Sequence, residues 1–209
     1  MIMCCSLILT SFMTTERLKT LGDSILLVSL TLLAYNLVPP SVVNGQLNAD
    51  EVEDFLDNLY GLISSFFVII VFWVIYTKIL DYLKKSNEIV VWVSLTFFIL
   101  VLLTPVFSVA LFQYKAQPSI TSLASLQIVN GILLVLLWMY LLRHRNMMTI
   151  ELKKNDNRYM YSILSVIPSV YAISIGIALI NIQMAIIFPV IMVPTMMLLG
   201  QAFHHQKNS

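Results

Sequence analysis

The stretch ERLKTLGDSILLVSLTLLAYNL, residues 16–37, opens with four charged side chains and continues without a charge to its end. About 20 mostly apolar residues are enough for a helix to cross the hydrocarbon core of a bilayer, at 1.5 Å per residue and roughly 30 Å of thickness. The stretch therefore predicts a membrane-spanning helix that begins with charges at one membrane surface.

The rest of the chain repeats this pattern. Of its 209 residues, 59% are hydrophobic and 11% are charged, and the mean hydropathy is +0.88. A soluble domain of this size cannot bury so much apolar surface, and segments of the alternating type that build a membrane barrel are missing. We predict one all-α integral membrane domain over residues 1–209, with six transmembrane helices. The spans are expected at about 20–38, 58–80, 89–112, 124–142, 159–180 and 182–203.

Other features of the chain give no further function. A net charge of +1 argues against a nucleic-acid-binding protein, because such proteins neutralise many phosphates. Cys4 and Cys5 are adjacent and the chain has no other cysteine, so we interpret them as incidental. The segment 1–13 is apolar but too short to span, and it lacks the basic start and cleavage site of a signal peptide. We interpret it as an interfacial segment, or as residues that precede a start at Met13.

The basic residues predict the orientation. Eleven of the twelve fall on connections that alternate to one side, which the positive-inside rule makes cytoplasmic, with both termini inside. Only Lys115 falls on the other side. The eleven are Arg17, Lys19, Lys78, Lys84, Lys85, Arg143, Arg145, Lys153, Lys154, Arg158 and Lys207.

The connection after the first span is acidic and contains no basic residue. Its carboxylates can be solvated side chains in the first turns of a helix, where they suit the helix dipole. They can also form a field that concentrates cations at a pore mouth, and the two interpretations are compatible. The acidic residues are Asp50, Glu51, Glu53, Asp54 and Asp57.

No ionisable residue lies in the middle of any predicted span, and this argues against several functions. Proton-coupled transporters, intramembrane proteases and membrane metalloenzymes normally place such residues at depth. His204 and His205 fall in a C-terminal tail that we interpret as interfacial. We expect neither an enzyme nor a cofactor. The six glycines are isolated, so a glycine-rich filter of backbone carbonyls is not expected either, and any pore must be lined by side chains.

The first span offers a candidate lining. Ser24, Val28, Thr31 and Tyr35 stand at i, i+4, i+7 and i+11, which is one helix face, and Leu27 and Leu32 flank it. In several copies around an axis, this face would form an apolar ring and a ring of hydroxyls. Read alone, however, the hydroxyls equally suit bonds to their own helix backbone or to neighbouring helices.

The charges at the start of this span need other partners. Arg17 and Asp23 are about 240° apart around a helix, so they do not pair with each other. An unpaired carboxylate near the membrane is costly, and we expect Asp23 to meet a partner at the end of the second span. The candidates there are Trp73, Tyr76, Thr77 and Lys78.

These residues resemble a known family. The segment RLKTLGD is similar to the arginine-x-x-x-Phe-Ser-Asp signature of the transmembrane protein 175 family, with Leu21 and Gly22 in place of Phe and Ser. The family comprises potassium channels of endosomes and lysosomes, with single-repeat relatives in bacteria and archaea. SFFVIIVFWVIYTKIL resembles the family's tryptophan-containing segment, with Tyr76 and Thr77 in place of a histidine pair. LLTPVFSVALFQY and LQIVNGILLVLLWMYLLRH look like later spans.

The resemblance implies a homotetramer in a prokaryotic cell membrane, with the first helices around a potassium pathway. It places the apolar constriction at Val28, the hydroxyl linked to selectivity at Thr31, and further pore positions at Leu32 and Tyr35. Arg17 and Asp23 then belong to a packing network with Trp73, Tyr76 and Thr77. Val28 is smaller than the family's usual residue and Tyr35 is larger, and loss of the histidine pair puts any pH response that depends on it in doubt.

We therefore expect a potassium-permeable channel with largely hydrated ions and modest selectivity. The partners are then other copies of the chain, the bilayer and monovalent cations. A small transporter is the first alternative, with Pro105, Pro168, Pro189 and Pro194 as places where spans could break. A non-conducting membrane scaffold is the second, and in it the hydroxyls only hold helices together.

Overall fold

The protein is described here by a computed structural model, which covers residues 14–35, 37–43, 46–47, 49–114, 116–149 and 154–208. Side chains are described within these ranges except at 42–50, 154–155 and 199–208. The predictions for residues 1–13, Cys4, Cys5 and Lys115 fall outside the described residues, and those for the side chains of His204 and His205 do too.

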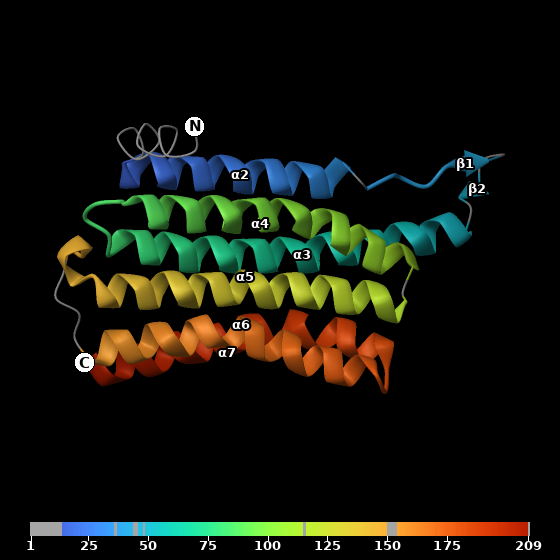
Figure 1. Cartoon of the computed structure of the whole chain (residues 1–209). Helices are drawn as coiled ribbons and strands as arrows, with labels where there is room; N and C mark the ends of the chain where they lie inside the picture. The colour runs from blue at the N-terminus through green and yellow to red at the C-terminus, as the bar shows by residue number, and fades with distance from the viewer. Residues whose placement is uncertain are drawn as a thin grey trace.

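Six long helices form the described fold, as predicted, and each runs antiparallel to the helix before it in the chain (Figure 1). Five are long and apolar enough to cross a membrane, and the sixth, α7, has a shorter apolar part at Ile182–Leu198. Seventeen residues lie at the lower end of the range for a transmembrane helix. The helices are α2 (Thr15–Tyr35), α3 (Ala49–Asp81), α4 (Glu88–Tyr114), α5 (Gln117–Arg143), α6 (Lys154–Ala178) and α7 (Ile182–Asn208).

The first helix differs from its predicted span at both ends. It begins at Thr15, where Thr14 Oγ1 accepts a hydrogen bond from the Arg17 backbone N–H at 3.4 Å, an N-terminal cap. It ends at Tyr35 rather than at residue 38, because Pro39 and Pro40 follow and the residue before a proline avoids the helical conformation.

A small hairpin is the second difference from the sequence prediction, which contained no strand. Strands β1 (Val42–Val43) and β2 (Gln46–Leu47) pair antiparallel in the connection between α2 and α3. They bracket the sequence Asn44-Gly45, a common signal for a tight hairpin turn. The hairpin is too short to change the all-α class.

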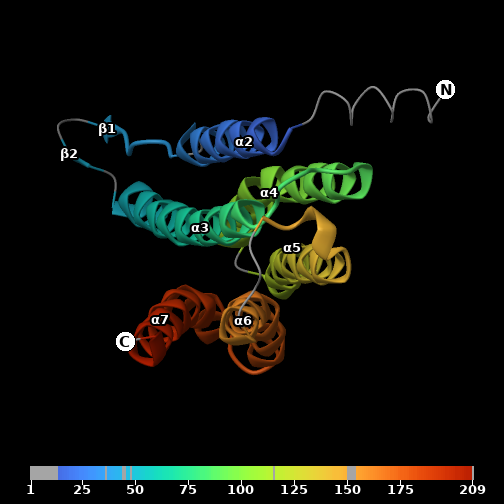
Figure 2. The same ribbon diagram turned by 90° about the vertical axis from the view of Figure 1, so that its left-hand side faces the viewer.

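The helices lie in layers, with α2 at one edge of the bundle (Figure 2). Helix α2 packs mainly on α4 and α3, while α5 connects this half to α6 and α7. Among the residues that the structure describes, both figures show the neighbouring helices of α2 on one side of it. One face of α2 is therefore left open in the described protomer.

A core of aromatic and branched side chains joins α2, α3 and α4. Tyr76 stacks on Phe97 with ring centroids 5.3 Å apart and meets the edge of Phe98 at 5.0 Å. Gly22 lets α2 approach these rings, since a Cβ atom there would stand 3.2 Å from Phe98 Cζ. This close approach fixes which side of α2 is buried.

The two ends of the bundle differ in charge. The start of α2, the turn between α3 and α4, and the connection between α5 and α6 lie together at one end (Figure 1). The described basic residues gather at this end. The hairpin and the acidic start of α3 lie at the other end, so the charge asymmetry expected from the sequence corresponds to opposite ends of one bundle.

Candidate functional site on the first helix

The open face of α2 carries every residue that the sequence suggests as a lining. Ser24, Leu27, Val28, Thr31, Leu32 and Tyr35 are all exposed in the described protomer. Leu27 is 67% exposed, Val28 49% and Tyr35 85%. The opposite face, with Leu18, Gly22, Ser29 and Leu33, is buried against the bundle. The fold thus places the hydroxyl and apolar residues of the stripe on one continuous surface.

The hydroxyls on this surface bond to their own helix. Ser24 Oγ donates to the carbonyl oxygen of Thr20 at 2.9 Å, and Thr31 Oγ1 donates to that of Leu27 at 2.8 Å. Such bonds are common for these residues in membrane helices, whatever their function. Because each hydroxyl proton is used within the helix, the oxygen lone pairs remain available outward, which suits a cation as the next neighbour.

Sequence reasoning missed one member of this row. Thr20 is exposed, stands four residues before Ser24, and donates to the carbonyl oxygen of Glu16 at 3.1 Å. The same i, i+4 spacing that links Val28 to Ser24 could have found it. With Thr20 the row of hydroxyls reaches the first turns of the helix.

Two polar contacts tie the N-terminal half of α2 to α3. Trp73 Nε1 donates to Asp23 Oδ1 at 2.7 Å, and Lys19 Nζ lies 2.6 Å from Asp81 Oδ1. The ion pair is largely exposed, so it contributes little stability, about 0–1 kcal/mol. A hydrogen bond to a carboxylate contributes more, about 1.5–3 kcal/mol. Together the contacts define how α2 is rotated about its axis.

The other expected members of the packing network behave differently. Tyr76 packs against Gly22 and two phenylalanine rings rather than against Asp23. Thr77 Oγ1 donates within its own helix to the carbonyl oxygen of Trp73 at 2.8 Å. Arg17 lies exposed in the first turn of α2. Lys78 is placed over the ring of Tyr159, 5.4 Å from its centroid.

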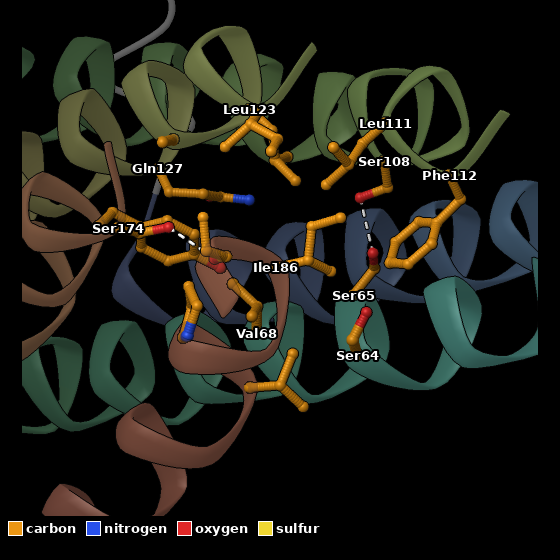
Figure 3. A pocket seen from close by; sticks show the side chains of 16 residues that line it. Ser64, Ser65, Val68, Ser108, Leu111, Phe112, Leu123, Gln127, Ser174 and Ile186 are labelled. Atoms are coloured by element: carbon orange, nitrogen blue, oxygen red, sulfur yellow. Dashed lines mark hydrogen bonds between the residues drawn. The ribbon is translucent and has the colours of Figure 1, made fainter. Parts of the chain in front are cut away.

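A separate, mostly apolar cavity of about 40 Å³ with a few polar groups lies inside the bundle, lined by residues of α3, α4, α5, α6 and α7 (Figure 3). Ser65 Oγ donates to Ser108 Oγ at 2.6 Å, and Ser174 Oγ donates to the carbonyl oxygen of Ala185 at 2.7 Å. Gln127 contributes the amide on its wall. The space is sufficient for a few water molecules and too small for an organic solute. It does not include α2.

An acidic cleft lies near the hairpin end. Asp54, Asp57 and Asn58 from α3 face Gln113 and Tyr114 from α4 across about 510 Å³ of open space. Carboxylates in a concave surface raise the local concentration of cations within a screening length of about 8 Å. This location agrees with either interpretation of the acidic connection.

The chain is similar to known potassium channels in part of its sequence and in its fold. Residues 17–105 match the family model described as "Endosomal/lysosomal potassium channel TMEM175". The matched segment contains α2 from residue 17 onward, all of α3 and most of α4. No curated protein gives a sequence match.

A solved structure shares the fold. It is the crystal structure of a lysosomal potassium-selective channel TMEM175 homolog from Chamaesiphon minutus. The match has a TM-score of 0.75 at 16% sequence identity, and it covers 89% of this chain and 97% of that chain. The resemblance to the TMEM175 family that the sequence indicates is confirmed by the family model over residues 17–105. The solved structure shows that the fold is shared over most of the chain.

Proposed function

We propose that this protein is a potassium-permeable channel whose pore is lined by the open face of α2 in a homotetramer. The observation that carries the proposal is the surface itself. Exposed hydroxyls and exposed apolar residues share that surface, on a helix whose described neighbours all lie on one side. The family match, which includes all of this helix from residue 17 onward, supports the same assignment.

In such an assembly, Val28 forms an apolar ring and Thr31 a ring of hydroxyl oxygens one turn further along. An apolar ring controls passage by excluding water when it is narrow, and neutral oxygens replace part of the hydration shell of an ion. Leu32 and Tyr35 narrow the path toward the hairpin end. Potassium crosses largely hydrated, with modest preference over sodium, and a cofactor has no part in this mechanism.

A second exposed hydroxyl face competes with this assignment. Ser162, Ser165 and Ser169 lie exposed on α6. That helix falls outside the segment 17–105 that matches the channel family, whereas α2 falls inside it. Helix α2 is therefore the better candidate for the pore.

The location follows from the same argument. The channel lies in a prokaryotic inner membrane with the basic end of the bundle, and hence both termini, in the cytoplasm. The acidic cleft then faces outward, where it attracts cations toward the path.

The test is a flux assay on purified protein in liposomes, which compares potassium with sodium for the wild type and Val28→Asn. We expect a potassium-preferring flux that rises in the variant, since a polar ring holds water where an apolar ring does not. Val106→Asn makes the same change at an exposed position of α4, 61% exposed, and should leave the flux unchanged.

Three results would speak against the proposal. Absence of flux from correctly inserted protein favours a transporter or a scaffold. An equal rise in Val28→Asn and Val106→Asn indicates a general leak. Equal permeability of potassium and sodium would contradict the proposed preference for potassium but not the proposed channel activity.

A further inference from the structure

Two connections at the basic end of the bundle are joined through their backbones. Leu83, between α3 and α4, forms an isolated antiparallel bridge with Met148, which follows α5. The Lys84 N–H donates to the carbonyl oxygen of Met147 at 2.7 Å, and the Thr149 N–H donates to that of Tyr82 at 2.9 Å. Residues far apart in the sequence are thereby held at fixed positions on the same surface.

This junction carries a group of exposed cations. We name it the basic clasp and define it as Lys84, Lys85, Arg143 and Arg145. Within the residues that the structure describes, none of the four forms an ion pair. Among the described residues, the clasp therefore presents several positive charges that no ion pair neutralises.

Three described carboxylates lie near the clasp. Asp81 is engaged by Lys19, and Asp156 faces Tyr82. Burial first, and then the charges of Asp156 and Asp81, raises the pKa of Tyr82 above its ordinary value. Glu88 opens α4 one turn after Lys84 and Lys85, where it suits the helix dipole. Even with Glu88 counted against the four cations, the described residues of this junction keep an excess of positive charge.

The lengths of the surrounding helices place the clasp at the expected level of the lipid headgroups. It joins the end of α3, the start of α4 and the end of α5, all of which are long enough to span the membrane. Tyr82, Tyr140 and Tyr159 are half-buried around it, and Tyr140 contacts His144 with ring centroids 4.4 Å apart. Aromatic side chains of this kind mark the boundary between hydrocarbon and headgroups.

We propose that the basic clasp binds the phosphate of an anionic phospholipid, such as phosphatidylglycerol. Arginine and lysine together offer a forked donor and a point charge, the combination that suits a phosphodiester. Basic pockets at the ends of transmembrane helices bind lipid headgroups by this chemistry. The positive-inside rule requires only that basic residues lie on one side of the membrane. It does not explain why the α3–α4 and α5–α6 connections are joined by backbone hydrogen bonds, beside four cations that form no ion pair with the described residues.

The experiment measures lipid binding to the purified full chain by native mass spectrometry, with phosphatidylglycerol and phosphatidylcholine as probes. The variants are Lys84→Gln, Arg145→Gln and the two combined. Arg158→Gln is the matched control, because it removes one exposed charge at the same end of the bundle but outside the clasp. Thermal unfolding in neutral detergent shows whether each variant folds normally.

We expect the wild type to prefer phosphatidylglycerol, and each clasp substitution to weaken that binding about fivefold while Arg158→Gln changes it little. Binding of phosphatidylcholine should stay constant throughout. If Arg158→Gln and Lys84→Gln weakened phosphatidylglycerol binding equally, the lipid would be responding to overall surface charge, and the proposed site would be wrong.

Two other outcomes would also overturn it. One is an absence of preference for the anionic lipid. The other is full displacement of phosphatidylglycerol by millimolar inorganic phosphate, which would identify a soluble anion as the ligand. If the double variant fails to fold, the single variants decide the question. All of these readouts are independent of ion flux, so they stand apart from the proposed channel.

Discussion

Trp73 on α3 donates a hydrogen bond from its indole nitrogen to the Asp23 carboxylate on α2, at 2.7 Å. Asp23 lies on an exposed part of α2, while Trp73 is half-buried. The bond satisfies the carboxylate and fixes the rotation of α2. It therefore determines which residues of α2 face away from the bundle.

Replacement of Trp73 by phenylalanine should lower the free energy of unfolding by about 1–3 kcal/mol, because Asp23 loses its donor while the ring remains. The measurement is thermal or denaturant unfolding in detergent. Trp92→Phe is the control, since Trp92 is 47% exposed on α4. Equal losses in the two variants would show that the bond to Asp23 contributes nothing.

Replacement of Thr31 by valine should reduce the preference for potassium over sodium without abolishing flux, because it removes a ring of oxygens and keeps the shape. Reversal potentials in planar bilayers measure this preference. Thr96→Val is the matched control: Thr96 is also exposed and donates to its own helix, at the carbonyl oxygen of Trp92 at 2.9 Å. A change of the same size in Thr96→Val would contradict the role of Thr31.

Three glycine-to-alanine variants should differ in stability according to the space around each Cβ. At Gly61 the new atom would overlap the Phe112 ring, and at Gly22 it would stand 3.2 Å from Phe98. We expect losses of about 1–3 kcal/mol, larger at Gly61. At Gly176 nothing lies within 4 Å, and alanine should stabilise the helix by about 0.5–1 kcal/mol.

Unfolding curves in detergent measure the relative stabilities of the three variants. A stabilising Gly22→Ala would show that α2 can move away from Phe98 at little cost, and the close packing of α2 would then be in doubt.

The hydroxyl pair in the internal cavity should show coupling in a double-mutant cycle. Ser65→Ala and Ser108→Ala each remove the same hydrogen bond, so the double variant should lose less stability than the sum of the two. A coupling of about 0.5–1.5 kcal/mol is expected from unfolding measurements. Additive losses would mean that water in the cavity satisfies each serine separately.

Local patterns in the sequence were sufficient for much of the fold. Six apolar runs gave the six helices, because hydrocarbon thickness imposes a length on each span. Helical spacing gathered Ser24, Val28, Thr31 and Tyr35 on one face, and the structure leaves that face open. The end of α2 at Tyr35 could also have been predicted, from the two prolines that follow.

Contacts between distant segments could not be predicted in this way. The bridge from Leu83 to Met148 joins two connections through backbone atoms, which carry no residue-specific signal. The cavity beside Gln127 depends on how several helices meet, and spacing within one helix says nothing about that. The sequence suggested four partners for Asp23, and only the packing of α2 on α3 selects Trp73.

The hydroxyls of Thr20, Ser24 and Thr31 all bond to their own helix. Displacing α2 relative to any neighbour therefore breaks none of these bonds. In the tetramer that we propose, these three hydroxyls would lose no hydrogen bond within the protomer when the spacing between copies of α2 changes. On the open face, dispersion contacts and the entry of water set the cost of such a change, and both change gradually with distance. The polar contacts that resist a movement of α2 lie on its other side, from Asp23 to Trp73 and from Lys19 to Asp81.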